Sequence, residues 1–275
     1  MKKSRLLIAL LMLLFAASGY AQDGLRETLK EYYRLSGQGS ESLSSLNQLN
    51  TYLFDNNGSV DLEQMAKRYV EESLTDWMVD LWVPKFQEIN LKEADLKQIN
   101  SLLATDAGQN YTAHQHEWSA ALNENLSTVM MENLAQIMSG DTSKPIQPKE
   151  GIEAGYIEKY KKSIAPNIIE SLMKILDSSA AQMPETYMTW MKTNLETITL
   201  NSAYGILTEE DLDFVEKLNS TDCYSKTKTL ISDLGQIKEL STEMITNYVK
   251  WMQDNGVPLK EGAENILKMI QNASF

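Results

Sequence analysis

The two histidines of this sequence lie close together, in the segment His114-Gln115-His116-Glu117. Two imidazoles can hold one metal ion from a helix when they are three or four positions apart, because that spacing puts both rings on one face. A spacing of two points the rings apart. We therefore predict no metal site here and interpret the segment as a solvated helix face.

Methionines offer a second kind of ligand chemistry. Met183, Met188 and Met191, with Trp190 beside them, are soft ligands of the type that Cu(I) prefers. Methionine is also a common filler of apolar cores, and methionines occur along the whole sequence. We expect the core role, and we predict no cofactor.

Paired carboxylates could supply the acid and the base of a hydrolase. The candidates are Glu71-Glu72 and Glu209-Glu210. Adjacent carboxylates on a helix are usually exposed, and the second pair lies where it can cap a helix. No Ser-His-Asp set, Gly-x-Ser-x-Gly elbow or glycine-rich phosphate loop is recognisable either. We predict no catalytic residue.

Cys223 is the single cysteine, so the chain cannot form an internal disulfide. It follows Asp222, with no histidine near it in sequence, and we interpret it as a structural thiol, at least partly buried, and not as a reactive one. The fold must then depend on apolar burial, for which a chain of this length suffices.

Aromatic side chains mostly fall on apolar stripes, so core packing is the expected role. An amphipathic groove that accepts a partner helix or an acyl chain is the sharper alternative. The aromatic residues in question are Tyr32, Tyr33, Trp77, Trp82, Trp118, Tyr187, Trp190 and Trp251.

The elements that must position these residues are helices. Glycine and proline are scarce, helix formers are common, and apolar residues recur at spacings of three and four. We predict an all-α fold, a multi-helix bundle built from two similar helical units. The predicted helices cover residues 25–35, 41–54, 61–82, 92–104, 106–138, 153–162, 166–180, 184–202, 208–219, 222–254 and 260–272.

Residues 1–21 have the three parts of a secretory signal peptide. A basic start, Met1-Lys2-Lys3-Ser4-Arg5, precedes the apolar run 6–17, and Gly19-Tyr20-Ala21 supplies small residues for cleavage. The run is shorter than the ~20 residues that span a bilayer. We expect a soluble exported protein with no stable membrane span after cleavage.

The net charge of the chain limits which classes of partner it can bind. Cleavage would remove three basic residues and no acidic one, which deepens the net charge from −13 to −16. An acidic chain does not suit nucleic acid, because neutralising phosphates needs a basic face. It favours solubility and cationic partners.

Residues 139–151 contain two prolines and two glycines, which cannot continue a helix. We predict a flexible linker there, between a first helical unit, 22–138, and a second, 152–275.

The two units share a motif. Residues 91–106 align with 207–222 at an offset of 116, and seven of the sixteen pairs are identical. In the second copy Thr208 is a predicted N-cap, and Glu209, Glu210 and Asp211 complement the helix dipole. Each copy is predicted to be a long helix, a short capped helix and a long helix.

This unit resembles the DUF2059 family of exported proteins, whose motif runs Phe-Thr-Glu-Glu-Glu-Leu, an aromatic pair, then Pro-x-Gly-Gln. Leu207-Thr-Glu-Glu-Asp-Leu212 matches well, Leu91-Lys-Glu-Ala-Asp-Leu96 less well, and Thr105-Asp-Ala-Gly-Gln109 matches the closing part. Leu29-Lys-Glu-Tyr-Tyr-Arg-Leu-Ser-Gly37 is similar to the helix that opens such domains. The departures are leucines or asparagine at the aromatic pair and Tyr224 in place of glycine.

The resemblance covers residues 25–130 and again 150–255. It implies an all-helical protein of the Gram-negative envelope, and it brings neither an activity nor functional residues. Our leading hypothesis is a non-enzymatic protein- or peptide-binding module, periplasmic or secreted. A carrier of a lipid or another apolar small molecule is the second hypothesis, and a hydrolase the third.

Overall fold

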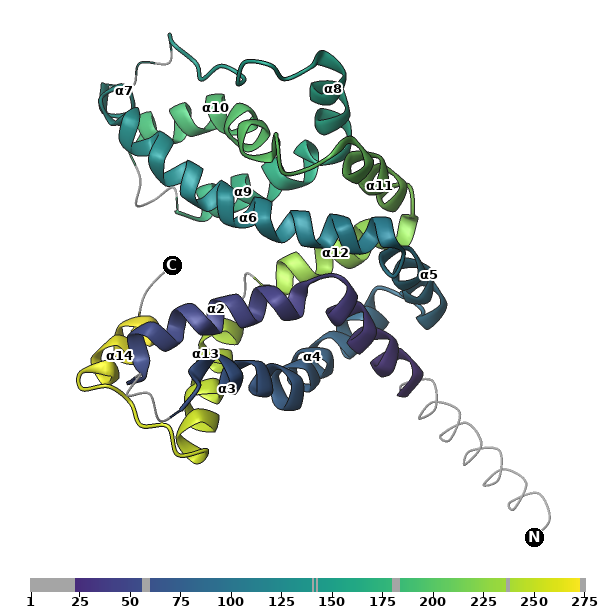
Figure 1. The fold of residues 1–275 in the computed structure, drawn as a ribbon, viewed down its shortest axis with the longest axis vertical. Helices are drawn as coiled ribbons and strands as arrows, with labels where there is room; N and C mark the ends of the chain where they lie inside the picture. The colour runs from purple at the N-terminus through teal and green to yellow at the C-terminus, as the bar shows by residue number, and fades with distance from the viewer. Residues whose placement is uncertain are drawn as a thin grey trace, which may run out of the picture. The chain divides into compact units, whose positions relative to one another are not determined.

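The computed structural model describes residues 23–55, 60–139, 141, 143–179, 184–235 and 238–272. Every regular element in these ranges is a helix, which confirms the predicted all-α fold (Figure 1). Among the helices that the structure describes, none has both the length and the apolar character needed to cross a membrane. The predicted signal peptide, residues 1–21, lies outside the described residues, as does Met183.

The chain packs as two compact units. Unit 1 takes its described residues from Met1–Ser101 and Cys223–Ser274, and unit 2 consists of those in Leu102–Asp222. This division differs from the predicted units 22–138 and 152–275, because each compact unit draws helices from both halves of the sequence.

Unit 1 begins with a helix over residues 23–35. Its other helices are α2 (Gln38–Leu53), α3 (Leu62–Tyr69), the π-helical turn η1 (Val70–Leu74), α4 (Thr75–Glu88), most of α5 (Glu93–Leu103), α12 (Asp222–Gly235), α13 (Lys238–Asp254) and α14 (Ala263–Asn272).

The helix predicted to stop before Pro84 does not stop there. Pro84 lies inside α4, exposed to solvent, and the helix continues to Glu88. The reason lies in Val83 and Phe86, which are buried on either side of the proline and hold the helix against the core. Tertiary packing outweighs the missing N–H of the proline.

Unit 2 contains the end of α5 and six further helices in the described residues. These are α6 (Asp106–Glu132), α7 (Leu134–Ser139), α8 (Ala154–Ser163), α9 (Ala165–Ser179), α10 (Glu185–Ala203) and α11 (Glu209–Asn219). The predicted continuous helix 106–138 is interrupted at Asn133, whose side-chain amide donates to the Val129 carbonyl and ends α6.

Helices from the first predicted half pack against helices from the second. The first half supplies α6, which packs on α10 and α11 from the second half. The second half supplies α13 and α14, which pack on α3 and α2 from the first half. A cut between residues 138 and 152 would therefore divide unit 2 through its core.

The two capped helices are built alike. α5 and α11 each have 11 residues. Asp95 accepts a hydrogen bond from the Lys92 N–H at 2.9 Å, and Asp211 accepts one from the Thr208 N–H at 2.7 Å. These parallels agree with the predicted repeat, although the similarity of the two whole units stays a prediction.

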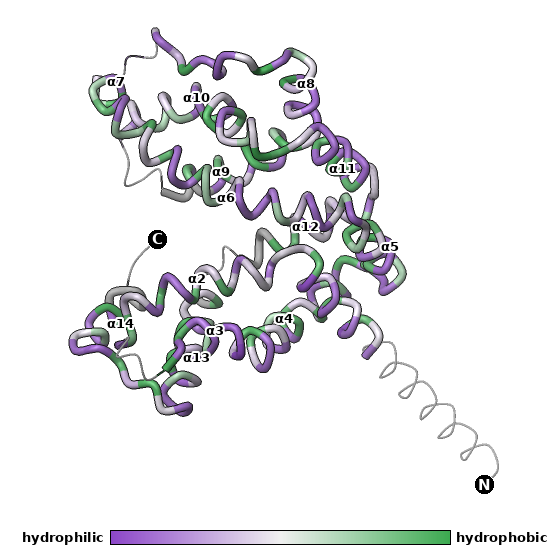
Figure 2. The backbone as a smooth tube through the Cα atoms, in the orientation of Figure 1, coloured by the Kyte–Doolittle hydropathy of each residue, from purple (hydrophilic) through white to green (hydrophobic). Residues whose placement is uncertain are grey.

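Each unit has its own aromatic core, and hydropathy alternates along its helices accordingly (Figure 2). In unit 1, the rings of Tyr33 and Trp82 lie 5.7 Å apart, and Tyr69 and Tyr248 lie 5.0 Å apart. In unit 2, Trp118 meets Tyr160 edge to face at 6.4 Å. Burying such a side chain stabilises the fold by roughly 1.5–3 kcal/mol.

Candidate functional site

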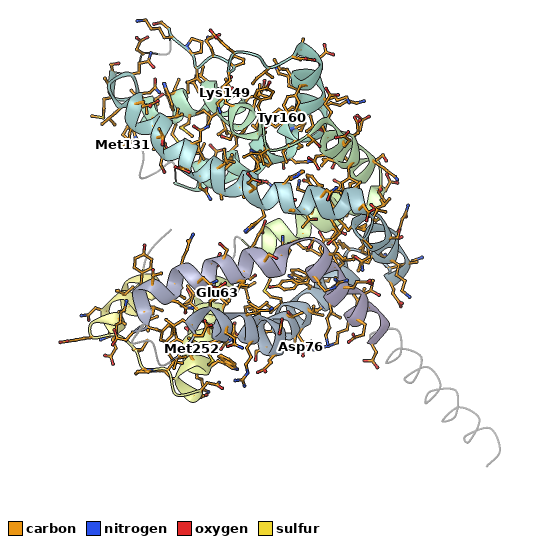
Figure 3. All side chains as sticks on the ribbon, in the orientation of Figure 1. Glu63, Asp76, Met131, Lys149, Tyr160 and Met252 are labelled. Atoms are coloured by element: carbon orange, nitrogen blue, oxygen red, sulfur yellow. The ribbon has the colours of Figure 1, made fainter. Side chains whose placement is uncertain are left out.

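Residues 143–153, which precede α8, run alongside α10 and are held by it (Figures 1 and 3). Residues 144–151, called the strap below, have no helix or strand, as the two prolines predict. The segment that the sequence predicts to be a flexible linker is thus held at several of its backbone atoms.

The first anchor is Asn194, which is only 1% exposed. Its Oδ1 accepts a hydrogen bond from the Ile146 N–H at 2.7 Å, and its Nδ2 donates to the Trp190 carbonyl at 2.9 Å. The amide is satisfied on both sides, which removes the cost of burying it.

The second anchor is Asn201, two helical turns further on and 8% exposed. Its Oδ1 accepts from the Lys149 N–H at 2.8 Å, while its Nδ2 donates to the Gln147 carbonyl at 3.0 Å. One side chain therefore binds a donor and an acceptor of the strap backbone at once.

The third anchor is Tyr204, which follows α10. Its hydroxyl donates to the Gly151 carbonyl at 3.0 Å, and its ring meets Tyr156 edge to face. Asn194, Asn201 and Tyr204 together are called the polar ladder below. The ladder binds peptide backbone and leaves strap side chains outside: Ile146 is half-buried, and the other strap residues are exposed.

The two histidines point to different surroundings, and neither is buried. His116 is exposed, whereas the His114 Nδ1 lies 2.8 Å from Oδ2 of the buried Asp211. Asp211 also accepts from the Thr208 hydroxyl at 2.8 Å. The His114 side chain is 35% exposed, and beyond what the sequence predicted it adds a third contact to the capping box of α11.

A histidine on a buried carboxylate is half of a catalytic triad. Here the Thr208 hydroxyl donates to Asp211 and not to the imidazole, so the hydrogen bond between nucleophile and base is missing from this cluster. Nearby, burial raises the pKa of Tyr156 to about 12, and the charge of Asp211 adds to the rise. The arrangement works as a helix cap.

The glutamate pairs considered as catalytic candidates lie at the surface or form ion pairs. Glu72 pairs with Arg68 and Glu209 with Lys159, while Glu71 and Glu210 are exposed. Among the described residues, no group of three or more His, Cys, Asp and Glu side chains is placed to hold a metal ion.

The sulfur-containing candidates are buried. Met188 and Met191 lie in the core of unit 2 with Trp190. Cys223 is buried in unit 1, and its Sγ lies 3.5 Å from the Asp95 carbonyl oxygen.

Unit 1 has an apolar groove of about 350 Å³ between α2, α4, α12 and α13. Trp77, one of the aromatics singled out from the sequence, lines it. Its apolar walls are completed by Met78, Leu81, Trp82, Ile231, Leu240 and Met244, and its polar rim by Gln38, Glu41, Ser42, Ser45 and Ser241.

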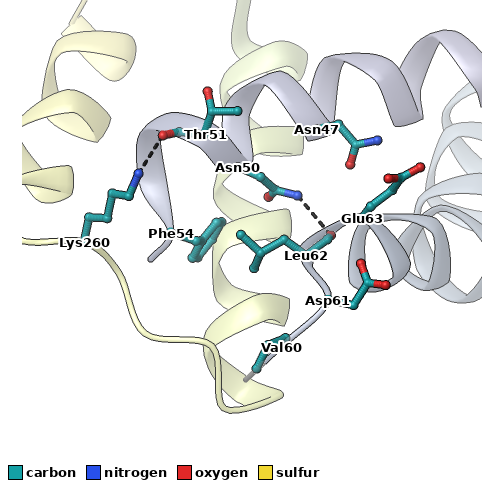
Figure 4. A pocket seen from close by; sticks show the side chains of 9 residues that line it. All are labelled: Asn47, Asn50, Thr51, Phe54, Val60, Asp61, Leu62, Glu63 and Lys260. Carbon is teal, nitrogen blue, oxygen red and sulfur yellow. Dashed lines mark hydrogen bonds between the residues drawn. The ribbon is translucent and has the colours of Figure 1, made fainter. Parts of the chain in front are cut away.

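A second, more polar hollow of about 770 Å³ opens beside α3 (Figure 4). The polar side chains that line it form hydrogen bonds within the fold. Asn50 donates to the Leu62 carbonyl and accepts from the Tyr248 hydroxyl, and Lys260 donates to the Thr51 carbonyl. We assign no chemistry to this hollow.

Sequence reasoning missed the polar ladder. The available signal was a pair of asparagines, seven positions apart, on the apolar side of α10, where asparagine is otherwise disfavoured. Two buried amides in such positions indicate a backbone partner, but not which segment supplies it.

No family model matches the chain, and neither a curated protein nor a solved structure matches it. The resemblance to the DUF2059 family therefore stays a prediction.

Proposed function

We propose that this protein is an exported, non-enzymatic helical module of the bacterial envelope that binds an extended segment of another protein. The polar ladder is the observation that carries this proposal. On α10, the side chains of Asn194 and Asn201 already hold a stretch of polypeptide without helix or strand by its backbone.

Backbone recognition of this kind suits a binding module. Main-chain hydrogen bonds provide attachment, and the exposed side chains of the bound segment leave room for selection by neighbouring groups. The acidic net charge of −13 favours basic partners. Export is supported by the signal-like residues 1–21.

The test is capture from envelope extract, using the full-length mature protein as bait. We expect a reproducible partner with the native chain and its loss with Asn201→Ala, which removes the two-sided anchor. Asn123→Ala is the matched control, because Asn123 is exposed on α6 of the same unit. The absence of any partner, or capture that is equal with all three baits, would contradict the proposal.

A carrier of a lipid or apolar small molecule is the second candidate function. The groove lined by Trp77, Met78 and Met244 favours it, because about 350 Å³ lies within the size range of small-molecule sites. Native mass spectrometry of freshly purified protein, followed by displacement of a fluorescent fatty acid, tests it. No co-purified ligand and no displacement would exclude this function.

A further inference from the structure

We propose that the polar ladder is a binding site for an extended peptide with Pro-x-x-Pro spacing, and that the strap is its internal ligand, which an outside segment must displace. This inference rests on the proposed function, and it names the site, the class of ligand and the regulation. The outside ligand is a basic, proline-containing segment of a partner protein.

The spacing of the strap matches the spacing of the ladder. Pro145 and Pro148 are three positions apart, and so are the N–H groups of Ile146 and Lys149 that face α10. In a peptide of polyproline II form, which has three residues per turn, N–H groups three positions apart recur on one side, about 9 Å apart. Asn194 and Asn201 are seven positions apart on α10, which is about 10.5 Å along a helix.

The strap and α10 also run in the same direction. Ile146 meets Asn194, Lys149 meets Asn201, and Gly151 meets Tyr204, so successive strap residues meet successive ladder residues. A repeated register of this sort is what a binding site for an extended peptide requires. Prolines favour it further, because they hold the free peptide in the bound shape and lower the entropy lost on binding.

An outside peptide could displace the strap from the polar ladder, because few strap side chains are buried. Only Ile146 is half-buried, and the neighbouring strap side chains are exposed, so little apolar surface opposes detachment. The amides of Asn194 and Asn201 are buried, and without the strap each would lose a backbone partner. The hold on the strap therefore comes mainly from these backbone hydrogen bonds, and the strap side chains add little to it.

The charge of the strap indicates which outside segments suit the site. It carries Lys144 and Lys149 against one acid, Glu150, in a chain whose net charge is −13. A basic Pro-x-x-Pro segment reproduces both the backbone pattern and this charge. An acidic segment would meet repulsion from the chain as a whole.

The test supplies the strap in trans to the full mature chain. In one variant, residues 144–150 are replaced by a glycine- and serine-containing segment of equal length. The probe is a fluorescent peptide with the sequence of residues 143–152, and its anisotropy reports binding. The matched probe has the same composition with the two prolines placed next to each other.

We expect the strap-replaced variant to bind the peptide saturably, at least about tenfold more tightly than the native chain does. Asn201→Ala in the replaced background should weaken binding by about tenfold or more, and Asn123→Ala should leave it unchanged. Absence of binding to a replaced variant that keeps its helical circular dichroism overturns the inference. Equal binding of the rearranged probe, or of the Asn201→Ala variant, does so as well.

A second variant covers the case in which the replacement prevents folding. Pro145→Gly combined with Pro148→Gly loosens the strap and keeps its N–H donors, so peptide should bind this variant more tightly than it binds the native chain. Equal affinity would overturn the inference. Capture of an Asn201-dependent partner without binding of the peptide would refute the ligand class alone, whereas peptide binding without any captured partner would refute the proposed function alone.

Discussion

Buried amides on α10 tie the fold of unit 2 to its proposed binding role. Asn201 satisfies a donor and an acceptor of the strap, and truncating it leaves both without a side-chain partner. We expect Asn201→Ala to lower the free energy of unfolding by about 1–3 kcal/mol, because two hydrogen bonds of about 0.5–1.5 kcal/mol each are lost. Urea denaturation followed by circular dichroism measures this.

Asn123→Ala is the control for that measurement, since Asn123 is exposed on α6. Its effect should remain within about 0.5 kcal/mol, as for ordinary surface substitutions. If both variants unfold at the same urea concentration as the native chain, Asn201 does not hold the strap.

Asp211 joins α11 to α6 through one carboxylate. It accepts from the Thr208 N–H and hydroxyl and contacts His114. Asp211→Ala should cost about 1–2 kcal/mol, because it removes the cap together with the contact to His114. Thermal unfolding compares it with Glu210→Ala, whose side chain is exposed in the same helical turn. An equal loss in both would show that neither the cap nor the contact with His114 adds stability.

At the scale of elements, the start of α6 depends on a glycine. A Cβ added to Gly108 would lie 2.5 Å from the Leu103 carbonyl oxygen and 2.6 Å from that of Leu102. Gly108→Ala should therefore destabilise the protein by about 1–3 kcal/mol, through overpacking against backbone. The midpoint of urea denaturation measures the loss.

Gly155 in α8 is the matched glycine, because nothing lies within 4 Å of an added Cβ there. Gly155→Ala should raise stability by about 0.5–1 kcal/mol, since alanine is the better helix former. Opposite signs at the two sites are the expected result. A neutral or stabilising Gly108→Ala would mean that α5 and α6 do not meet as closely as described.

Helix periodicity predicted most elements but not their breaks. The sequence around Pro84 predicts a stop, yet buried Val83 and Phe86 carry α4 past it. The sequence around Asn133 predicts no stop, yet its side chain caps α6. Local propensities are small and tertiary packing decides between them.

At the scale of the whole molecule, the sequence order did not predict which helices pack together. Each compact unit receives helices from both halves, and the crossings lie near the ends of α5 and α11, the two similar capped helices. An internal repeat identifies equivalent helices, but it does not specify whether a helix packs with its own copy or with the other. Long-range contacts such as that of Asp211 with His114, 97 positions apart, were unpredictable for this reason.

Buried tyrosines in both units predict how stability depends on pH. Burial raises the pKa of several tyrosines to about 12, from an ordinary value of 10.0: Tyr33, Tyr69, Tyr156, Tyr224 and Tyr248. Between these values the unfolded chain has lost protons that the folded chain keeps, so the free energy of unfolding falls as pH rises. Below about pH 10, these groups should have no such effect.

Urea denaturation across the alkaline range, together with tyrosinate absorbance, checks this prediction. We expect the unfolding midpoint to drop above about pH 10, with ionisation of most tyrosines delayed until the chain unfolds. Ionisation of all tyrosines near their ordinary pKa, in a chain that stays folded, would contradict the described cores.

Hydrogen exchange at the amides of Ile146 and Lys149 tests the central claim most directly, because these are the strap donors that the polar ladder holds. If the strap is a displaceable ligand, both amides should be protected, yet they should exchange by local opening, faster than amides in the middle of α10, and Asn201→Ala should speed the exchange at Lys149. Exchange of both amides only through global unfolding, at the rate of the α10 core, would contradict the account, because the strap would then be a fixed part of the fold.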